Sequence, residues 1–365
     1  MTSTSEKLFK DRPEWNDITP IPQHDPNANP IAPIFYNEAC KYSAFSCLIY
    51  KDATNYFRGV IQAQEMSERV LELTEAIIRM NPAHYSVWQY RFQTLLKIKT
   101  PLDEELELMD EFAEKHLKSY QVWHHRRLLV QRGALALSTV TNTGKTPATE
   151  LAFISRALTA DAKNYHTWAY RQWVLSFFNQ PALWDGEMRY IDNMLEDDVR
   201  NNSVWHHRFF VVFASGVHVK DGEEIEDQDN VVRRELDYTK EKIALAPNNA
   251  SAWNYLRGVL QHSGKPFSDL TEFVIPYAAP LSAEENRPER ENDSVVDLEN
   301  PRPSEGADLP CVQAIEFLAD IHESSGGEQL SKAISLWKSL ANEHDTIRKK
   351  YWEHRIRDAQ LTRDS

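Results

Sequence analysis

One sequence pattern recurs five times along this 365-residue chain and decides its fold. The copies read HYSVWQYR (84–91), SYQVWHHR (119–126), NYHTWAYR (164–171), NNSVWHHR (201–208) and NASAWNYL (249–256). The tryptophans at their centres are Trp88, Trp123, Trp168, Trp205 and Trp253, spaced 35 to 48 residues apart. A weaker sixth copy surrounds Trp352. Internal repeats of this length are typical of arrays of two-helix units.

The stretch before each tryptophan predicts a second, amphipathic helix. The first apolar stripe at helical spacing comprises Met66, Val70, Leu73, Ile77 and Met80. Asn81 and Pro82 interrupt it, and similar stripes cover 102–117 and 232–246. Each unit is therefore predicted to be a helix–turn–helix hairpin that buries its apolar face only against its neighbours. The predicted fold class is all-α: an α–α superhelix, a crescent-shaped solenoid of hairpins.

The chain outside the repeats predicts an arm and several loops. Six prolines between residues 13 and 33 predict an extended proline-rich arm over 1–35, followed by a repeat domain over 36–365. Polar or charged composition predicts a loop at 138–149, an acidic turn at 221–229 and a mobile loop at 282–309.

Composition excludes several classes of function. A net charge of −14 argues against nucleic acid or an anionic membrane surface as partners. Cys40, Cys47 and Cys311 have no CxxC spacing, so a reducing compartment is expected and no zinc site. Neither a signal peptide nor an apolar run of about 20 residues is found. We therefore expect a cytoplasmic protein without membrane insertion.

Comparing equivalent positions separates core residues from special ones. The tryptophan is predicted to be packing, and the arginine three residues later a structural stitch between repeats. The serine two residues before the tryptophan suits a helix cap, but copies two and three replace it with Gln121 and His166.

The same turns also carry a lysine and a phenol, as Lys118 with Tyr120 and Lys163 with Tyr165. A lysine and a tyrosine at a helix N-terminus can form an anion site, which would suit phosphate or diphosphate. Nucleotide-binding, hydrolase and metalloprotease motifs are missing, and the adjacent histidines at 124–125 and 206–207 diverge on a helix. Any catalysis by this chain is therefore expected to be shared with another polypeptide.

These motifs resemble the repeats of protein prenyltransferase α subunits. The resemblance rests on the segments 118–127, 161–173, 198–205 and 250–256, and it extends from about Trp15 to the 345–352 segment. It is strongest to the α subunit shared by protein farnesyltransferase and protein geranylgeranyltransferase type I. Residues 42–53 look like an insertion relative to that family.

The resemblance implies a heterodimer that transfers farnesyl or geranylgeranyl from an isoprenoid diphosphate to the cysteine of a carboxy-terminal CaaX motif. The β subunit would hold the zinc that activates the thiol, and magnesium would assist farnesyl transfer. The resemblance implies a catalytic role for Lys118 and Tyr165. It further implies substrate contacts for Tyr120, Gln121, Lys163, Asn164 and His166, with Gln121 reaching the CaaX carboxylate.

Two alternatives remain at this point. The α subunit of Rab geranylgeranyltransferase shares the repeat but receives its substrate with an escort protein. A non-enzymatic scaffold of the tetratricopeptide type would need a peptide groove but no lysines paired at the turns. The intact Lys163–His166 motif favours the CaaX enzymes.

Overall fold

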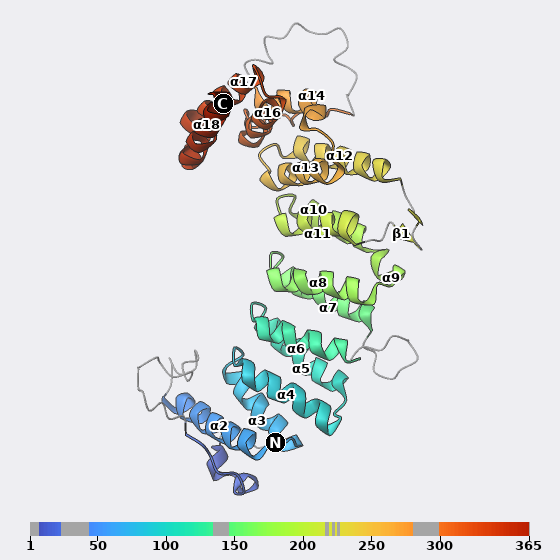
Figure 1. Ribbon diagram of the computed structural model, residues 1–365. Helices are drawn as coiled ribbons and strands as arrows, with labels where there is room; N and C mark the ends of the chain where they lie inside the picture. The colour runs from blue at the N-terminus through green and yellow to red at the C-terminus, as the bar shows by residue number, and fades with distance from the viewer. Residues whose placement is uncertain are drawn as a thin grey trace. The chain divides into compact units, whose positions relative to one another are not determined.

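The computed structural model describes residues 7–22, 44–133, 146–215, 219–220, 223–224, 227–279 and 299–364. The chain divides into two compact units, Met1–Phe178 and Asn179–Ser365. Helices dominate both units, which confirms the all-α prediction (Figure 1). Within the described ranges the strands are limited to a short antiparallel pair, β1 (Val219–Lys220) and β2 (Glu223–Glu224).

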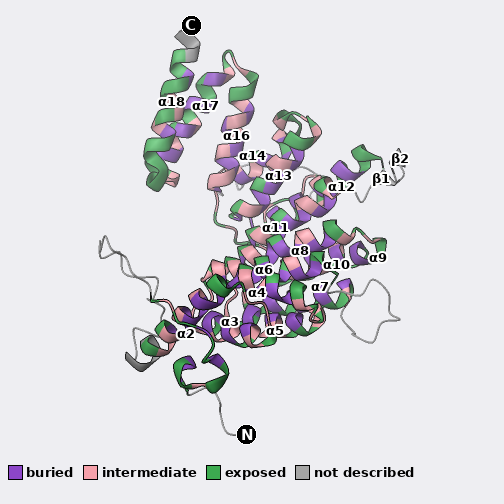
Figure 2. Cartoon of the chain, turned by 60° about the horizontal axis from the view of Figure 1, so that its bottom comes forward, coloured by how far each residue is buried: buried purple, intermediate pink, exposed green. Residues whose placement is uncertain are grey.

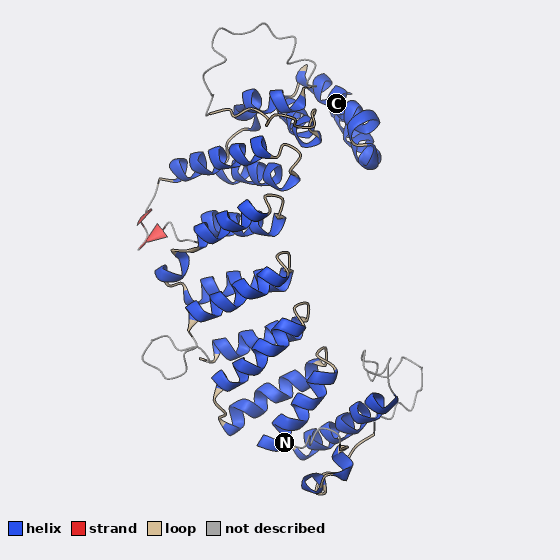
Figure 3. Cartoon of the chain, turned by 180° about the vertical axis from the view of Figure 1, so that it is seen from behind, coloured by secondary structure: helices blue, strands red, loops and turns tan. Residues whose placement is uncertain are grey.

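The first unit is built from paired helices. Two 3-10 turns, η2 (Phe9–Asp11) and η3 (Pro13–Trp15), precede them. The helices are α2 (Ala44–Ala63), α3 (Glu68–Met80), α4 (Tyr85–Ile98), α5 (Leu102–Lys115), α6 (Tyr120–Gln131), α7 (Pro147–Ala160) and α8 (Tyr165–Phe178). Helices α3 and α4, α5 and α6, and α7 and α8 pack as hairpins, as predicted, and α6 contacts both α4 and α8. The three turns that join these pairs lie along one edge of the unit, called here the turn edge (Figure 3).

The second unit contains two further hairpins and a carboxy-terminal group of helices. Its elements are α9 (Pro181–Trp184), α10 (Glu187–Asp197), α11 (Asn202–Phe209), the π-turn η4 (Phe210–Ala214), α12 (Gln228–Leu245), α13 (Ala250–Ser263), η5 (Phe267–Leu270), α14 (Thr271–Ala278), α16 (Val312–Ser325), α17 (Gln329–Ser339), the π-turn η6 (Leu340–His344), η7 (Thr346–Arg348) and α18 (Lys349–Asp364). The weak copy at Trp352 lies in α18, and its ring shares a buried cluster with Trp337 and Ile315.

Each repeat tryptophan is hydrogen-bonded to the turn that precedes its helix. The five rings are at most 5% exposed, in line with the buried stripes that run along the helices (Figure 2). In every copy the indole N–H donates to the carbonyl six residues earlier, at 2.8–2.9 Å: Trp88 to Pro82, Trp123 to Leu117, Trp168 to Ala162, Trp205 to Val199 and Trp253 to Pro247. The tryptophan therefore supplies core packing and also holds the path of the turn.

Buried arginines connect consecutive hairpins. Each of three forms two hydrogen bonds with a glutamate in the first helix of the next hairpin. The pairs are Arg91 with Glu105, Arg126 with Glu150, and Arg208 with Glu235, at 2.5–3.1 Å. These contacts confirm the predicted stitch in three copies. Where Leu256 breaks the series, the next residue, Arg257, pairs with Asp320.

Two loop predictions need correction where the structure describes them. Residues 138–145 lie outside the described residues, but the predicted loop does not reach 149, because Thr146 caps α7 and Pro147 opens it. The predicted acidic turn at 221–229 contains β2 and ends at Asp227, which caps α12. Both α7 and α12 therefore begin at a capping residue inside a stretch that its polar composition alone predicts to be a loop.

The predicted mobile loop at 282–309 also needs correction in its second half. Residues 282–298 lie outside the described residues, whereas the segment 299–309 is held against α12 and the turn after it. Lys240 Nζ donates to the carbonyl of Glu299 at 2.8 Å, and Asn248 Nδ2 donates to that of Asp308 at 2.8 Å. Because long-range contacts anchor this segment, its charged composition does not reveal its order.

The amino-terminal arm is described over 7–22, and there it is folded onto the helices instead of being extended. Pro13 opens a 3-10 turn, a position that suits its fixed φ. Trp15 is fully buried, with its ring 5.5 Å from Phe9 and 6.0 Å from Tyr56 of α2. Aromatic burial therefore outweighs the tendency of a proline-rich segment to stay extended.

The remainder of the predicted arm, 1–6 and 23–35, lies outside the described residues. Of the predicted insertion at 42–53, the residues from Ala44 onward form the first part of the continuous helix α2. Within the described part of the chain this segment is therefore helical and does not form a separate loop.

Candidate functional site

An exposed tyrosine opens the second helix of every hairpin in the first unit. Tyr85, Tyr120 and Tyr165 are the first residues of α4, α6 and α8, and they are 72%, 63% and 78% exposed. The tryptophan three residues later fixes the backbone, so the phenols are not needed for packing. Three equivalent exposed rings on the turn edge indicate a surface available for another molecule.

Copies two and three bring their aromatic side chains together. The ring of Tyr120 lies 6.4 Å from that of His166, and His166 lies 5.6 Å from Tyr165. His124, one helical turn after Tyr120, stacks on it nearly parallel at 5.8 Å. Three residues singled out from the sequence therefore form one cluster across α6 and α8.

Lys118 lies beside this cluster in a groove along the turn edge. The groove is lined by residues 114–121, which end α5 and lead into α6, by residues 79–83 of the preceding hairpin, and by Asp161. Lys118 is exposed and has no ion-pair partner among the residues that the structure describes. Lys115, one helical turn earlier, is instead paired with Glu111 at 2.7 Å. Lys118 is therefore available to an incoming anion.

The start of α6 adds to this positive character. Ser119 holds the cap position, but its side chain accepts no hydrogen bond from the first turn of the helix. The partial positive charge of uncapped amides at a helix N-terminus favours an anion, as the Lys118 ammonium does. Lys118 and the amino end of α6 therefore combine in one electropositive corner.

Lys163 and Asn164 lie in the equivalent turn before α8. Lys163 is exposed, and its backbone amide donates to Asp161 at 3.3 Å. Asn164 is 3% exposed, and its side-chain oxygen accepts from the amide of Thr167 at 3.0 Å and from its hydroxyl at 3.1 Å. Asn164 therefore caps α8 and positions the exposed residues that follow it.

The capping role lies at a different position from the predicted one. Asn201 and Asn249 cap α11 and α13 from four residues before the tryptophan, as Asn164 caps α8. The serines two residues before the tryptophan are already the second residues of their helices, so the sequence interpretation of them as caps is wrong. The asparagines of copies three to five were the signal that identifies the cap.

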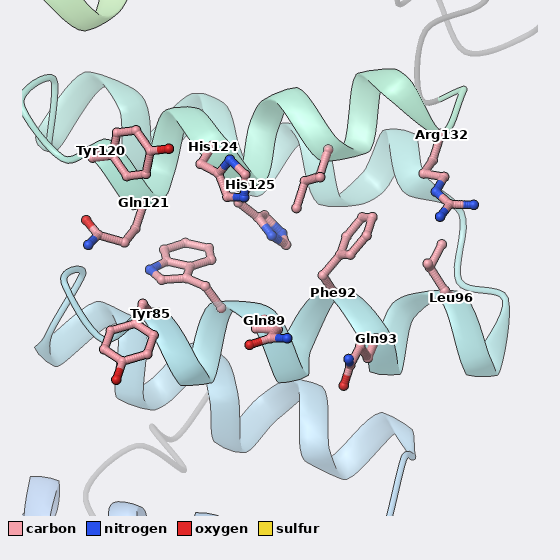
Figure 4. A pocket seen from close by; sticks show the side chains of 12 residues that line it. Tyr85, Gln89, Phe92, Gln93, Leu96, Tyr120, Gln121, His124, His125 and Arg132 are labelled. Atoms are coloured by element: carbon pink, nitrogen blue, oxygen red, sulfur yellow. The ribbon is translucent and has the colours of Figure 1, made fainter.

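A second groove of about 560 Å³ separates α4 from α6. In Figure 4, Tyr85, Tyr120 and Gln121 lie at one end of it, and Phe92, Leu96 and Arg132 lie toward the other. Tyr120 and Gln121 line both grooves. The arrangement thus joins a polar, cationic corner to a more apolar channel.

A buried ion network supports the floor of this second groove. Glu105 accepts from Arg91 and from His125 Nε2, at 2.7 and 2.9 Å. Burial alone would raise the pKa of Glu105, but the hydrogen bonds from His125 and Arg91 hold it at about 2. Burial lowers the pKa of His125 below its ordinary value. The adjacent histidines diverge as predicted, with His125 in this network and His124 exposed on the cluster.

Neither a metal cluster nor a membrane helix emerges in the described ranges. No three side chains of the metal-binding types converge there. No helix in the same ranges combines the length and apolarity needed to cross a bilayer. What the turn edge offers is hydrogen-bond donors and positive charge for an anion.

Tyr85 and His124 are among the groove residues that were missed in the sequence. Tyr85 belongs to the same phenol column as Tyr120 and Tyr165, so the column could have identified it. His124 stands beside a histidine that is buried, and the sequence offers no signal that separates the two before the face of each is known.

The comparisons with known proteins agree with this arrangement. A family model described as the protein prenyltransferase alpha subunit repeat matches residues 67–98, 102–133, 147–178, 184–215 and 232–263. A protein farnesyltransferase/geranylgeranyltransferase type-1 subunit alpha from Dictyostelium discoideum is 30% identical over 345 residues, which cover 94% of this chain and 92% of the relative.

Two further similarities separate the alternatives. A geranylgeranyl transferase type-2 subunit alpha from Mus musculus is 29% identical, but over 58% of this chain and 37% of the relative. Among solved structures, Candida albicans protein geranylgeranyltransferase-I complexed with GGPP matches with a TM-score of 0.69 and 27% identity. That match covers 94% of this chain and 97% of the other. Similarity to the type-1 proteins therefore extends over nearly the whole chain.

Proposed function

Since this chain belongs to the family of protein prenyltransferase alpha subunits, we propose that it is the α subunit of a heterodimeric CaaX prenyltransferase. The complex would transfer a farnesyl or geranylgeranyl group from its diphosphate to the cysteine of a carboxy-terminal CaaX motif. The main support is the cluster of Tyr120, His166 and Tyr165 beside Lys118, whose ammonium has no ion-pair partner in the described part of the chain.

The chemistry proposed for this chain is stabilisation of the leaving group. As the carbon–oxygen bond to diphosphate breaks, negative charge grows on the diphosphate oxygens. Lys118 and the phenol of Tyr165 would bind that charge more strongly in the transition state than in the ground state, which accelerates the step. Tyr120, Lys163 and His166 would hold the diphosphate in place, and Asn164 would fix the turn that presents them.

Gln121 is assigned to the other substrate. Its amide lies between the turn-edge groove and the groove between α4 and α6, where a peptide end could meet the isoprenoid site. We propose that it donates a hydrogen bond to the carboxylate that ends the CaaX motif. A neutral donor suits this task because it is selective without requiring a second buried charge.

The remaining parts of the reaction belong to the partner. The β subunit would hold zinc, which lowers the pKa of the cysteine thiol, and magnesium would assist farnesyl transfer. In the residues that the structure describes, this chain has no group of side chains suited to either metal. A cytoplasmic location remains a prediction.

The test is reconstitution. The chain is co-expressed with a farnesyltransferase β subunit or a geranylgeranyltransferase type I β subunit, and transfer to a CaaX peptide is measured. We expect a stable complex and activity with at least one of the two, and none from the isolated chain. Activity only with a Rab geranylgeranyltransferase β subunit and an escort-bound Rab protein would support that alternative instead. Failure of all pairs would refute the proposal.

A further inference from the structure

Ser119 occupies a helix cap position without capping its helix. At the same position before α8, α11 and α13, an asparagine accepts a hydrogen bond from the first turn. Ser119 makes no such bond, although serine is a favourable cap. Its hydroxyl donates instead to Oε1 of Gln121, at 3.4 Å. Copy two therefore directs its cap side chain toward another side chain.

This contact gives the Gln121 amide a direction. With Oε1 turned toward Ser119, the amide nitrogen keeps its two N–H donors for a ligand. Gln121 is half-buried and lines both grooves, so those donors lie where a ligand of either groove can meet them. An amide held this way complements a carboxylate, which only accepts hydrogen bonds.

We propose that Ser119 is a positioning residue that holds the Gln121 amide with its N–H groups toward the peptide end. It thereby favours a peptide that ends in a carboxylate over one that ends in a carboxamide. The inference rests on the proposed function, in which Gln121 binds the carboxyl end of the CaaX motif. Without the hydroxyl, the amide can rotate by half a turn and offer its oxygen to a carboxamide.

The experiment uses the α–β complex and two peptides that differ only at the carboxyl end, one a free carboxylate and one a primary amide. The measured quantity is the ratio of their kcat/KM values. Ser119→Ala is expected to lower this ratio about fivefold, the effect of one ordinary hydrogen bond. The change should appear in the KM for the carboxylate peptide. The kcat at saturation and the KM for the isoprenoid diphosphate should not change.

Three variants separate positioning from a structural effect. Ser119→Thr keeps a hydroxyl and should keep the ratio. Ser86→Ala removes a hydroxyl from the first turn of α4, beside the neighbouring groove at residues 61–66, and should also leave the ratio unchanged. In a Gln121→Ala background, Ser119→Ala should have no further effect, because the two residues act as one unit.

The outcomes distinguish this inference from the proposed function. A wild-type complex that modifies neither peptide refutes the proposed function, and the inference with it. A wild-type complex that discriminates normally, with Ser119→Ala discriminating equally well, refutes the positioning role alone. So does an equal loss caused by Ser119→Ala when Gln121 is already absent. If Ser119→Ala lowers the melting temperature, Ser119→Thr decides: loss of discrimination with an intact fold and hydroxyl refutes the role.

Discussion

Within the described ranges Lys118 has no acidic partner, unlike its neighbour Lys115, although both lie near the turn into α6. We predict that Lys118→Ala slows the chemical step about 100-fold, in the range found for removal of one transition-state donor. The affinity for the isoprenoid diphosphate should fall much less, because the bound diphosphate keeps its other donors. A single-turnover assay and a direct binding assay measure the two effects separately.

Lys115→Ala is the matched control. It removes the same charge from a second residue that lines the turn-edge groove, but its ammonium is already paired with Glu111, so the rate should stay near wild type. Equal losses of rate and affinity in Lys118→Ala would assign the residue to binding alone.

Single residues show what a repeated pattern can single out and what it cannot. Lys118, Gln121 and His166 could be identified because they depart from an otherwise repeated pattern. Asn164 shares that motif, but whether an amide faces a ligand or its own helix depends on the backbone of the turn. The Ser119–Gln121 contact depends on two side-chain rotamers, which no periodicity encodes.

At the scale of the helical hairpin, the indole has two functions that a pair of substitutions can separate. Trp168→Ala should lower the free energy of unfolding by about 3–5 kcal/mol, since it leaves a cavity in the core. Trp168→Phe keeps much of the packing but loses the hydrogen bond to the carbonyl of Ala162, and should cost about 1–3 kcal/mol. Denaturant unfolding measures both, and equal stability of the phenylalanine variant would show that the indole N–H is dispensable.

Substitution of a buried Arg–Glu pair that connects two hairpins should lower stability more than substitution of a surface ion pair. Glu150 is 2% exposed and accepts from Arg126 and from the hydroxyl of Tyr170. Glu150→Gln removes the buried carboxylate that makes two hydrogen bonds with Arg126 and leaves the guanidinium with only Asp110, at 2.7 Å, so it should cost about 3 kcal/mol.

The matched surface control is Glu111→Gln, which breaks exposed pairs with Arg79 and Lys115. Its expected cost is below about 1 kcal/mol. Similar losses in the two variants would contradict the role of the stitch.

Element boundaries were predictable where periodicity and stop signals agree, as at Asn81-Pro82 after α3. Boundaries were missed where a few long-range contacts determine whether a segment is ordered. The amino-terminal turns form because Trp15 finds an aromatic pocket on α2, and the segment 299–309 is ordered by hydrogen bonds to α12. Both segments are ordered by contacts with residues distant in sequence, and such contacts cannot be predicted from local composition.

At the scale of the whole molecule, buried ion networks make stability depend on pH. The folded pKa of Glu105 is about 2 against an ordinary 4.5, so this carboxylate stabilises the fold above about pH 4.5 and progressively less as the pH falls toward 2. The pKa of His125 is also lowered, which adds a loss that begins as the pH falls through its ordinary value of 6.5.

Glu105→Gln should therefore flatten the acid side of the stability profile, where the wild-type carboxylate contributes about 3 kcal/mol. Urea unfolding at a series of pH values measures the slope. The same slope between pH 4.5 and 2 in both proteins would show that the acid sensitivity originates elsewhere.

The hydrogen bond from each indole to the carbonyl six residues earlier has a consequence for how such chains diversify. Because the buried ring holds the turn in place, the exposed side chains of the turn are not needed for folding. Two residues before the tryptophan, copy two carries an amide (Gln121), copy three an imidazole (His166) and the other three copies a serine, on the same scaffold. A single substitution at this position can therefore change the functional group that a repeat presents, without changing the backbone that carries it.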